Sequence, residues 1–150
     1  MTTLLKLTDH PRHLDAAARM VHEEFWADRP GHSPERMAAR MREADDAAGI
    51  PMTLVAVTDD DTVAGVINLV DNDDDDRAHL RPWLAGLVVR EDLRGRGIGS
   101  ALVRGLLAEA RRLGVATVYF GTDGPGFYER LGATVHEQVR SDFCIMQIHP

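Results

Sequence analysis

A glycine-rich run, Arg94-Gly95-Arg96-Gly97-Ile98-Gly99-Ser100, stands between an apolar stretch, Trp83–Val89, and a segment of helical periodicity, Ser100–Leu113. The pattern predicts a strand before the run and a helix after it. A turn of this kind allows several backbone N–H groups to point at one place, where the positive end of the following helix adds to their field. The run therefore predicts a phosphate-bearing ligand that is held mainly by backbone groups.

The composition is that of one globular domain spanning residues 1–150. The chain is 44% hydrophobic and 27% charged, which is ordinary for a soluble domain. No apolar run approaches the ~20 residues that cross a bilayer, and the N-terminus lacks the layout of a signal peptide. The single cysteine, Cys144, excludes an internal disulfide. We therefore expect a cytoplasmic protein with no membrane partner.

The charge distribution is more informative than the net charge of −7, which argues against nucleic acid as a partner. Acidic residues concentrate in Asp59–Asp61 and Asp71–Asp76, whereas arginines surround the glycine run. The Asp73–Asp76 run has two interpretations, a solvated mobile loop or an acidic rim that attracts a cationic substrate. The run lacks the spaced oxygen ligands and glycine of an EF-hand, so we expect no metal site.

Periodicity and turn residues divide the rest of the chain into strands and helices. Ser33-Pro34-Glu35 is a strong helix start, with Ser33 as the N-cap and Pro34 at the first helical position. The expected helices are Leu14–Phe25, Ser33 to Gly49 with an apolar stripe of Met37, Met41 and Ala44, Ser100–Leu113, and Phe127–Leu131. The expected strands are Leu4–Leu7, Met52–Thr58, Thr62–Val70, Trp83–Val89, Val115–Phe120, 135–139 and Phe143–Ile148. This order predicts one mixed sheet flanked by helices.

Two motifs together resemble the GNAT superfamily, the GCN5-related N-acetyltransferases. Arg94-x-x-Gly97-x-Gly99 fits the family's pyrophosphate motif, Gln/Arg-x-x-Gly-x-Gly/Ala. The later sequence Phe127-Tyr128-Glu129-Arg130-Leu131-Gly132-Ala133 is similar to a second signature, in which an aromatic pair precedes Leu-Gly. The order of elements also agrees, so the similarity covers most of the chain. It implies an α/β fold (an α+β mixed sheet) with about seven strands and about four helices.

The resemblance implies that acetyl-CoA is the co-substrate and binds where two parallel strands part, here Trp83–Val89 and Val115–Phe120. The backbone of the first strand would bind the pantetheine arm, through Leu87, Val88 and Val89. The glycine run would wrap the pyrophosphate, through Arg94, Gly95, Arg96, Gly97, Ile98, Gly99 and Ser100. A Cβ on these glycines would obstruct the close approach of the ligand. A solvated helix face is the better interpretation of Arg104.

The implied chemistry is direct attack of a neutral amine on the thioester, with coenzyme A leaving as a thiolate. The Val89 N–H would stabilise the oxyanion. Tyr128 would protonate the thiolate, although a core aromatic is the alternative interpretation of that residue. The sequence does not name a general base: Asp71 and His79 are candidates, a loop role is commoner for both, and a chain of water molecules could serve instead.

These observations predict an acetyl-CoA-dependent N-acetyltransferase that acts on a primary amine of a small molecule or peptide. Three alternatives stay open: an acyltransferase that uses a longer acyl-CoA, a protein N-terminal acetyltransferase and a non-catalytic acyl-CoA-binding module. The resemblance also suggests a homodimer formed through the terminal strands. The identity of the acceptor is not predicted, because the first two helices and the Asp71–Arg81 loop carry no motif that names it.

Overall fold

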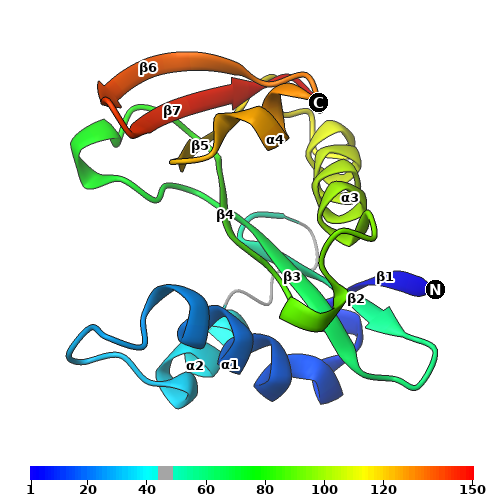
Figure 1. The fold of residues 1–150 in the computed structure, drawn as a ribbon. Coiled ribbons are helices and arrows are strands. Elements are labelled where there is room, and N and C mark those ends of the chain that lie inside the picture. Colours follow the sequence, from blue (N-terminus) through cyan, green and yellow to red (C-terminus); the bar gives the residue numbers. More distant parts are fainter. Residues whose placement is uncertain (44–48) are drawn as a thin grey trace.

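The computed structural model describes residues 1–43 and 49–150. A seven-stranded mixed sheet forms its centre, in the order β1-β2-β3-β4-β5-β7-β6 (Figure 1). The strands are β1 (Thr2–Lys6), β2 (Met52–Thr58), β3 (Val63–Val70), β4 (Trp83–Val89), β5 (Val118–Thr122), β6 (Thr134–Arg140) and β7 (Phe143–Ile148). The helices are α1 (Leu14–Phe25), α2 (Pro34–Glu43), α3 (Ile98–Arg112) and α4 (Pro125–Glu129). The expected fold class is confirmed.

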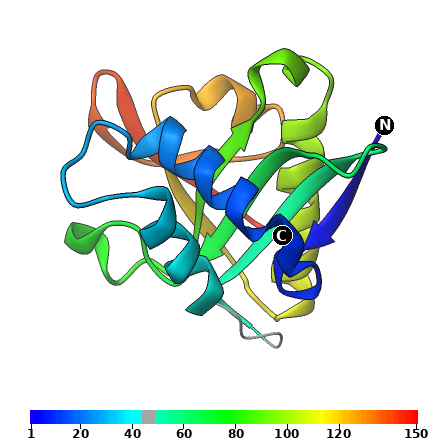
Figure 2. The ribbon, with the colours of Figure 1, turned by 90° about the horizontal axis from the view of Figure 1, so that it is seen from below.

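Helices cover the two faces of the sheet separately. Helices α1 and α2 lie on one face, and α3 lies on the other (Figures 1 and 2). One side of α1 is apolar at helical spacing, and its residues Leu14, Ala17, Ala18 and Val21 are buried. Across the sheet, Leu102, Val103 and Leu106 of α3 are fully buried. Because β2 and β3 lie between both helical layers, almost all of their residues are buried.

The start of α2 is the one that the sequence predicts. The Ser33 Oγ accepts a hydrogen bond from the Arg36 N–H at 3.1 Å, and Pro34 is the first helical residue. Met41 is buried as expected. Ala44, the last expected member of the stripe, lies outside the described residues.

Several boundaries differ from the sequence-based prediction, and three of the differences have a clear local cause. Helix α3 begins at Ile98 instead of Ser100, because Gly97 serves as the N-cap with a φ of 82°. Strand β5 begins at Val118 instead of Val115, because the Val115 N–H donates to the Ala110 carbonyl at 3.0 Å and so closes the end of α3. Helix α4 begins at Pro125, a favoured first position that the apolar pattern overlooks. The first shift changes the site, since it places the last glycine of the run inside the first helical turn.

None of the helices in the described part of the chain combines the length and the apolar character that crossing a bilayer requires.

The packing of α3 on β3 leads to a stability prediction at Gly65. A Cβ at this position would lie 2.8 Å from the Leu102 Cδ1 and 3.2 Å from the Val88 carbonyl oxygen. We expect Gly65→Ala to lower the free energy of unfolding by about 1–3 kcal/mol, because the buried layer has no room for another carbon. Urea unfolding measures this. Gly124→Ala is the control, since its Cβ would have no neighbour within 4 Å; equal losses in both variants would contradict the packing argument.

Candidate active site

Strands β4 and β5 separate after a single pair of residues. They run parallel and pair only at Trp83 and Tyr119, where the Tyr119 N–H donates to the Pro82 carbonyl at 3.0 Å. The rest of β4 pairs with β3 alone. The parting of these two strands agrees with the sequence-based expectation.

The edge of β4 that faces this opening carries free peptide groups. The Arg90 N–H donates to the Ala64 carbonyl of β3 at 2.8 Å. The N–H and C=O of one strand residue point to the same side, and those of the next residue point to the opposite side. The backbone groups of Val88 therefore also face β3, whereas those of Leu87 and Val89 face the opening. The Val89 carbonyl confirms this direction, since it accepts a hydrogen bond from the Arg94 Nε at 2.9 Å. Val88 was expected to offer its backbone to a ligand, but its peptide group is turned toward β3.

A bulge at Gly86 bends β4 at the place where β5 departs. The register between β3 and β4 shifts between Val66 and Asn68, and Gly86 has a φ of 62°. The Asn68 Nδ2 donates to the Ala85 carbonyl at 3.3 Å and would lie 2.8 Å from a Cβ on Gly86. A bulge turns a strand out of line with its neighbour. A glycine inside an apolar strand was the available signal for this feature.

A cavity of about 570 Å³ connects the open edge of β4 with the glycine run. It brings together most of the predicted cofactor-binding residues, namely Leu87, Val88, Val89, Arg94, Gly95, Gly97, Ile98, Gly99 and Ser100. It adds residues to which the sequence analysis gave no binding role, namely Glu24, Leu93, Arg104, Phe127, Arg130 and Leu131. Arg96 instead lines a neighbouring cavity of about 670 Å³, beside the turn between β2 and β3. Tyr128 lines neither cavity.

The first turn of α3 presents uncapped amides to this cavity. The first bond of the helix runs from the Ala101 N–H to the Gly97 carbonyl at 3.0 Å, and no side chain caps the helix. The N–H groups of Ile98, Gly99 and Ser100 therefore have no partner within the helix. No acidic residue lies in this turn, so its positive end stays available to an anion.

The glycines of the run are required for different reasons. Gly95 and Gly97 have φ values of 78° and 82°, and a Cβ on either would meet no atom within 4 Å. The left-handed backbone is therefore the requirement at both positions, and the space beside them stays open for a ligand. Gly99 is helical, and a Cβ there would lie 3.4 Å from the Cζ of Phe127. Its small size lets α4 approach the start of α3.

Arg94 links the glycine run to α1 across the cavity. While its Nε donates to the Val89 carbonyl, its Nη2 lies 3.7 Å from the Oε2 of Glu24. Both side chains are about half exposed. Among the described residues that line the cavity, Glu24 is the acidic one. A carboxylate in a cavity suited to phosphate opposes the ligand unless a cation neutralises it.

Tyr128 is a residue of α4 and belongs to an aromatic cluster between this helix and β5. Its ring centroid is 4.4 Å from that of Phe120 and 4.9 Å from that of Phe127. Burial, helped by the charge of Asp123, raises the pKa of the Tyr128 hydroxyl to about 12. The hydroxyl is therefore protonated at any physiological pH, and it is a weaker acid than an ordinary phenol.

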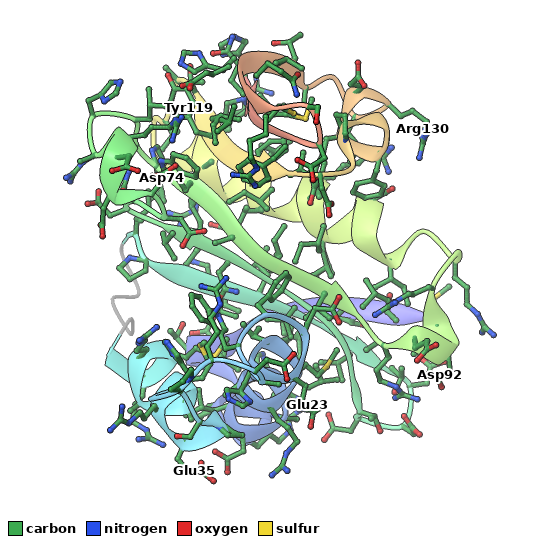
Figure 3. The ribbon with its side chains drawn as sticks, turned by 60° about the vertical axis from the view of Figure 1, so that its left-hand side comes forward. Glu23, Glu35, Asp74, Asp92, Tyr119 and Arg130 are labelled. Atoms are coloured by element: carbon green, nitrogen blue, oxygen red, sulfur yellow. The ribbon has the colours of Figure 1, made fainter. Side chains whose placement is uncertain are left out.

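The acidic Asp71–Arg81 loop is held in place by a network of hydrogen bonds. The Asn72 Nδ2 donates to the carbonyls of Arg77 and Leu80, each at 3.0 Å. Arg77 donates to both carboxylate oxygens of Glu137 on β6, at 3.0 and 2.6 Å, and these bonds lower the pKa of Glu137. Figure 3 shows Asp74 of this loop on the same side of the sheet as Tyr119. These hydrogen bonds attach the loop to β6, which differs from the interpretation of this segment as a mobile loop.

The two candidates for the general base do not reach the cavity. Asp71 pairs with Arg81, whose Nη1 lies 2.5 Å from the Asp71 Oδ2. His79 is exposed on the same loop. Neither residue lines the cavity that contains the edge of β4, so both assignments stay predictions.

Comparisons with known proteins agree on one family. The sequence profile described as Acetyltransferase (GNAT) family matches residues 18–133. A search of curated proteins found no significant match. Similar solved structures include an aminoglycoside 6'-N-acetyltransferase complexed with coenzyme A (19% identity, 98% of this chain and 96% of that one, TM-score 0.76). Another is yncA from Salmonella typhimurium with its cofactor acetyl-CoA (22% identity, 99% of this chain and 94% of that one, TM-score 0.76). A third is the aminoglycoside 6'-N-acetyltransferase from Enterococcus faecium (20% identity, 98% of this chain and 96% of that one, TM-score 0.74).

The pairing of Glu24 with Arg94 leads to a binding prediction. Glu24→Gln keeps the shape of the side chain and removes its charge, so Arg94 is free to turn toward a phosphate. We expect coenzyme A to bind about three- to fivefold tighter by calorimetry, in keeping with a half-exposed ion pair. Glu23→Gln is the matched control, since Glu23 directly precedes Glu24 on α1 and does not line the cavity. Weaker binding to Glu24→Gln would show that the carboxylate instead helps to hold Arg94 in its binding position.

Proposed function

Because this chain belongs to the GNAT acetyltransferase family, we propose that it transfers the acetyl group of acetyl-CoA to a primary amine by direct attack. The observation that carries the proposal is the cavity that joins the free edge of β4 to the uncapped first turn of α3. One end suits an extended amide chain, and the other suits a pyrophosphate. Acetyl-CoA joins these two groups in one molecule and supplies an activated acetyl thioester.

The residues of the cavity fit this co-substrate. The Leu87 and Val89 peptide groups offer hydrogen bonds of the kind that an added strand would make with the pantetheine arm. The amides of Ile98, Gly99 and Ser100 offer donors to the pyrophosphate, and the open space beside Gly95 and Gly97 lets it approach. The placement of Arg96 in the neighbouring cavity leaves its backbone as the part that serves the turn.

The Val89 N–H is proposed as the donor that stabilises the oxyanion when the amine attacks. Its peptide group faces the opening, and its carbonyl is already engaged by Arg94. The Leu87 N–H lies on the same edge two residues deeper in the strand, so it offers a second donor with the same direction. Backbone donors in a rigid strand need no rearrangement when charge develops on the carbonyl oxygen.

Tyr128 is proposed to stabilise the departing thiolate by donating a hydrogen bond. Complete proton transfer from a hydroxyl with a pKa of about 12 to a thiolate of pKa about 8.5 is uphill by about 5 kcal/mol. A hydrogen bond lowers the energy of the thiolate without that cost. Solvent can then supply the proton, because a thiol of this pKa is mostly protonated at neutral pH.

The acceptor is proposed to be cationic, on the evidence of the acidic loop. Asp73, Asp75 and Asp76 are exposed on a loop that hydrogen bonds to β6 hold in place, so their charges stay at one side of the molecule. Negative charge there raises the local concentration of an ammonium substrate. Since similar structures include aminoglycoside acetyltransferases, aminoglycosides belong among the amines to be tested.

The function is tested by incubating the protein with acetyl-CoA and a panel of amines, polyamines, aminoglycosides and peptides while free thiol is measured. We expect thiol release that depends on an amine. Gly97→Ala should reduce it at least tenfold at low acetyl-CoA, because its left-handed backbone costs an alanine about 1–3 kcal/mol; Gly124→Ala should not. Binding of coenzyme A without release would favour the non-catalytic module, and release only with free peptide N-termini would favour the N-terminal acetyltransferase. Absence of binding would end the proposal.

Tyr128→Phe separates hydrogen bonding from acid catalysis. We expect kcat to fall about 10- to 50-fold, while the KM for acetyl-CoA stays near its original value because the hydrogen bond strengthens only as the thiolate departs. The hydroxyl has a pKa of about 12, so its ionisation should be invisible in a kcat profile from about pH 6 to pH 10. A basic limb that is present in the natural protein and missing from Tyr128→Phe would instead show that the hydroxyl titrates within this range.

A further inference from the structure

Two arginines of the cavity have no role in the proposed reaction. Arg104 extends from α3, and Arg130 follows directly after α4; both line the cavity that contains the glycine run. Within residues 1–43 and 49–150, no ion pair forms at either guanidinium, whereas Arg94 pairs with Glu24 and Arg112 pairs with Glu109. The cavity therefore keeps two cationic groups that the protein itself does not neutralise.

Both arginines lie close to the turn that would bind the pyrophosphate. Arg104 is four residues after Ser100, so it lies one helical turn further, about 6 Å along the axis, on the same face of α3. Arg130 approaches from the other side. Phe127 of α4 packs at Gly99, which brings the end of α4 beside the start of α3. Figure 3 shows the Arg130 side chain at the periphery of the molecule, directed away from the sheet.

A phosphate monoester is the chemical group that fits two free guanidinium groups. Its charge is close to −2 at neutral pH, and guanidinium binds phosphate oxygens in a bidentate manner. The pyrophosphate would already be served by the amides of α3. Arg104 lies one helical turn beyond these amides on α3, and Arg130 lines the same cavity, so both are candidates to meet a group that the ligand carries past its pyrophosphate.

We propose that Arg104 and Arg130 bind the 3′-phosphate of coenzyme A and thereby select it over dephospho-coenzyme A. This assignment rests on the proposed function, since it takes coenzyme A as the ligand. The 3′-phosphate belongs to the ribose that carries the pyrophosphate on its 5′ carbon, so the two phosphate groups are separated by one sugar. One turn of α3 separates the amide donors from Arg104, which is a distance of the same size.

Calorimetric titration of coenzyme A and dephospho-coenzyme A tests the proposal. The natural protein should bind coenzyme A at least tenfold more tightly. Arg104→Gln and Arg130→Gln should each lower the affinity for coenzyme A by about tenfold, which is the usual effect of losing one hydrogen bond to a charged group. Their affinity for dephospho-coenzyme A should stay within about twofold, which also shows that the variants fold. The control is Arg111→Gln, an exposed arginine of α3 that does not line the cavity.

The outcomes separate this proposal from the function on which it rests. If the natural protein binds both ligands with equal affinity, or if the variants lose affinity for both ligands equally, these arginines do not recognise the 3′-phosphate. The acetyltransferase proposal then stands. If neither ligand binds the natural protein, the proposed function itself fails. If only one of the two variants loses the preference, the site belongs to that arginine alone and the two-arginine assignment is wrong.

Discussion

The separation of β4 from β5 is the constraint on which the rest of the site depends. Two parallel strands that paired along their whole length would satisfy each other's peptide groups and leave no space between them. Here one pair at Trp83 and Tyr119 holds the sheet together, and the bulge at Gly86 bends β4. Peptide groups that lose a partner must find another. The Val89 carbonyl accepts a hydrogen bond from Arg94, and Leu87 and Val89 both line the cavity.

The same reasoning explains the charge pattern. The chain has a net charge of −7 and yet contains a cavity suited to a polyanion. Screening limits the reach of exposed charges to about 8 Å at physiological ionic strength, so nearby groups decide the local potential. At the glycine run these groups are the amides of α3 and the three arginines 94, 104 and 130, opposed by Glu24. The acidic residues of the Asp71–Arg81 loop do not line this cavity, so they can favour a cationic partner without repelling the anionic one.

The sequence predicted the elements and their order because each one follows from local patterns. The apolar stripe of α1, the Ser33 cap of α2 and the glycine run all act through residues close to them in the chain. Features that depend on contacts between distant residues were missed. The bulge at Gly86 lies beside Asn68 of β3, whose Nδ2 donates to the Ala85 carbonyl, and Arg130 lines the cavity because α4 packs at Gly99. The start of α3 at Ile98 was missed for a local reason, because it depends on the left-handed backbone of Gly97 and not on the apolar pattern.

The site residues divide in the same manner. The position of Leu87, Val89 and the glycines in one cavity was predictable, since a motif fixes their place in the turn and strand. Arg96 was not, because alternate residues of a left-handed turn point in different directions and only the folded turn shows that Arg96 faces the neighbouring cavity. Glu24 could not be predicted either, because it lies 70 positions from Arg94 in the sequence and no motif connects them. The residues proposed to bind acetyl-CoA could thus be predicted from the sequence better than those proposed to receive the amine.

In the proposed reaction, protonation of the departing thiolate and deprotonation of the ammonium before it attacks make unequal demands, and the deprotonation makes the larger one. Protonation of a thiolate of pKa about 8.5 is favourable by about 2 kcal/mol at pH 7. The hydrogen bond proposed for Tyr128 is therefore enough help for the departure of the thiolate. An ammonium of pKa about 10.4 must lose its proton at a cost of about 5 kcal/mol before it can attack. Acidic residues that attract the ammonium also stabilise it and raise that cost. The proposed attraction of the ammonium and its deprotonation are therefore best performed at different places. The Asp71–Arg81 loop lies outside the cavity that contains the edge of β4, which meets this requirement.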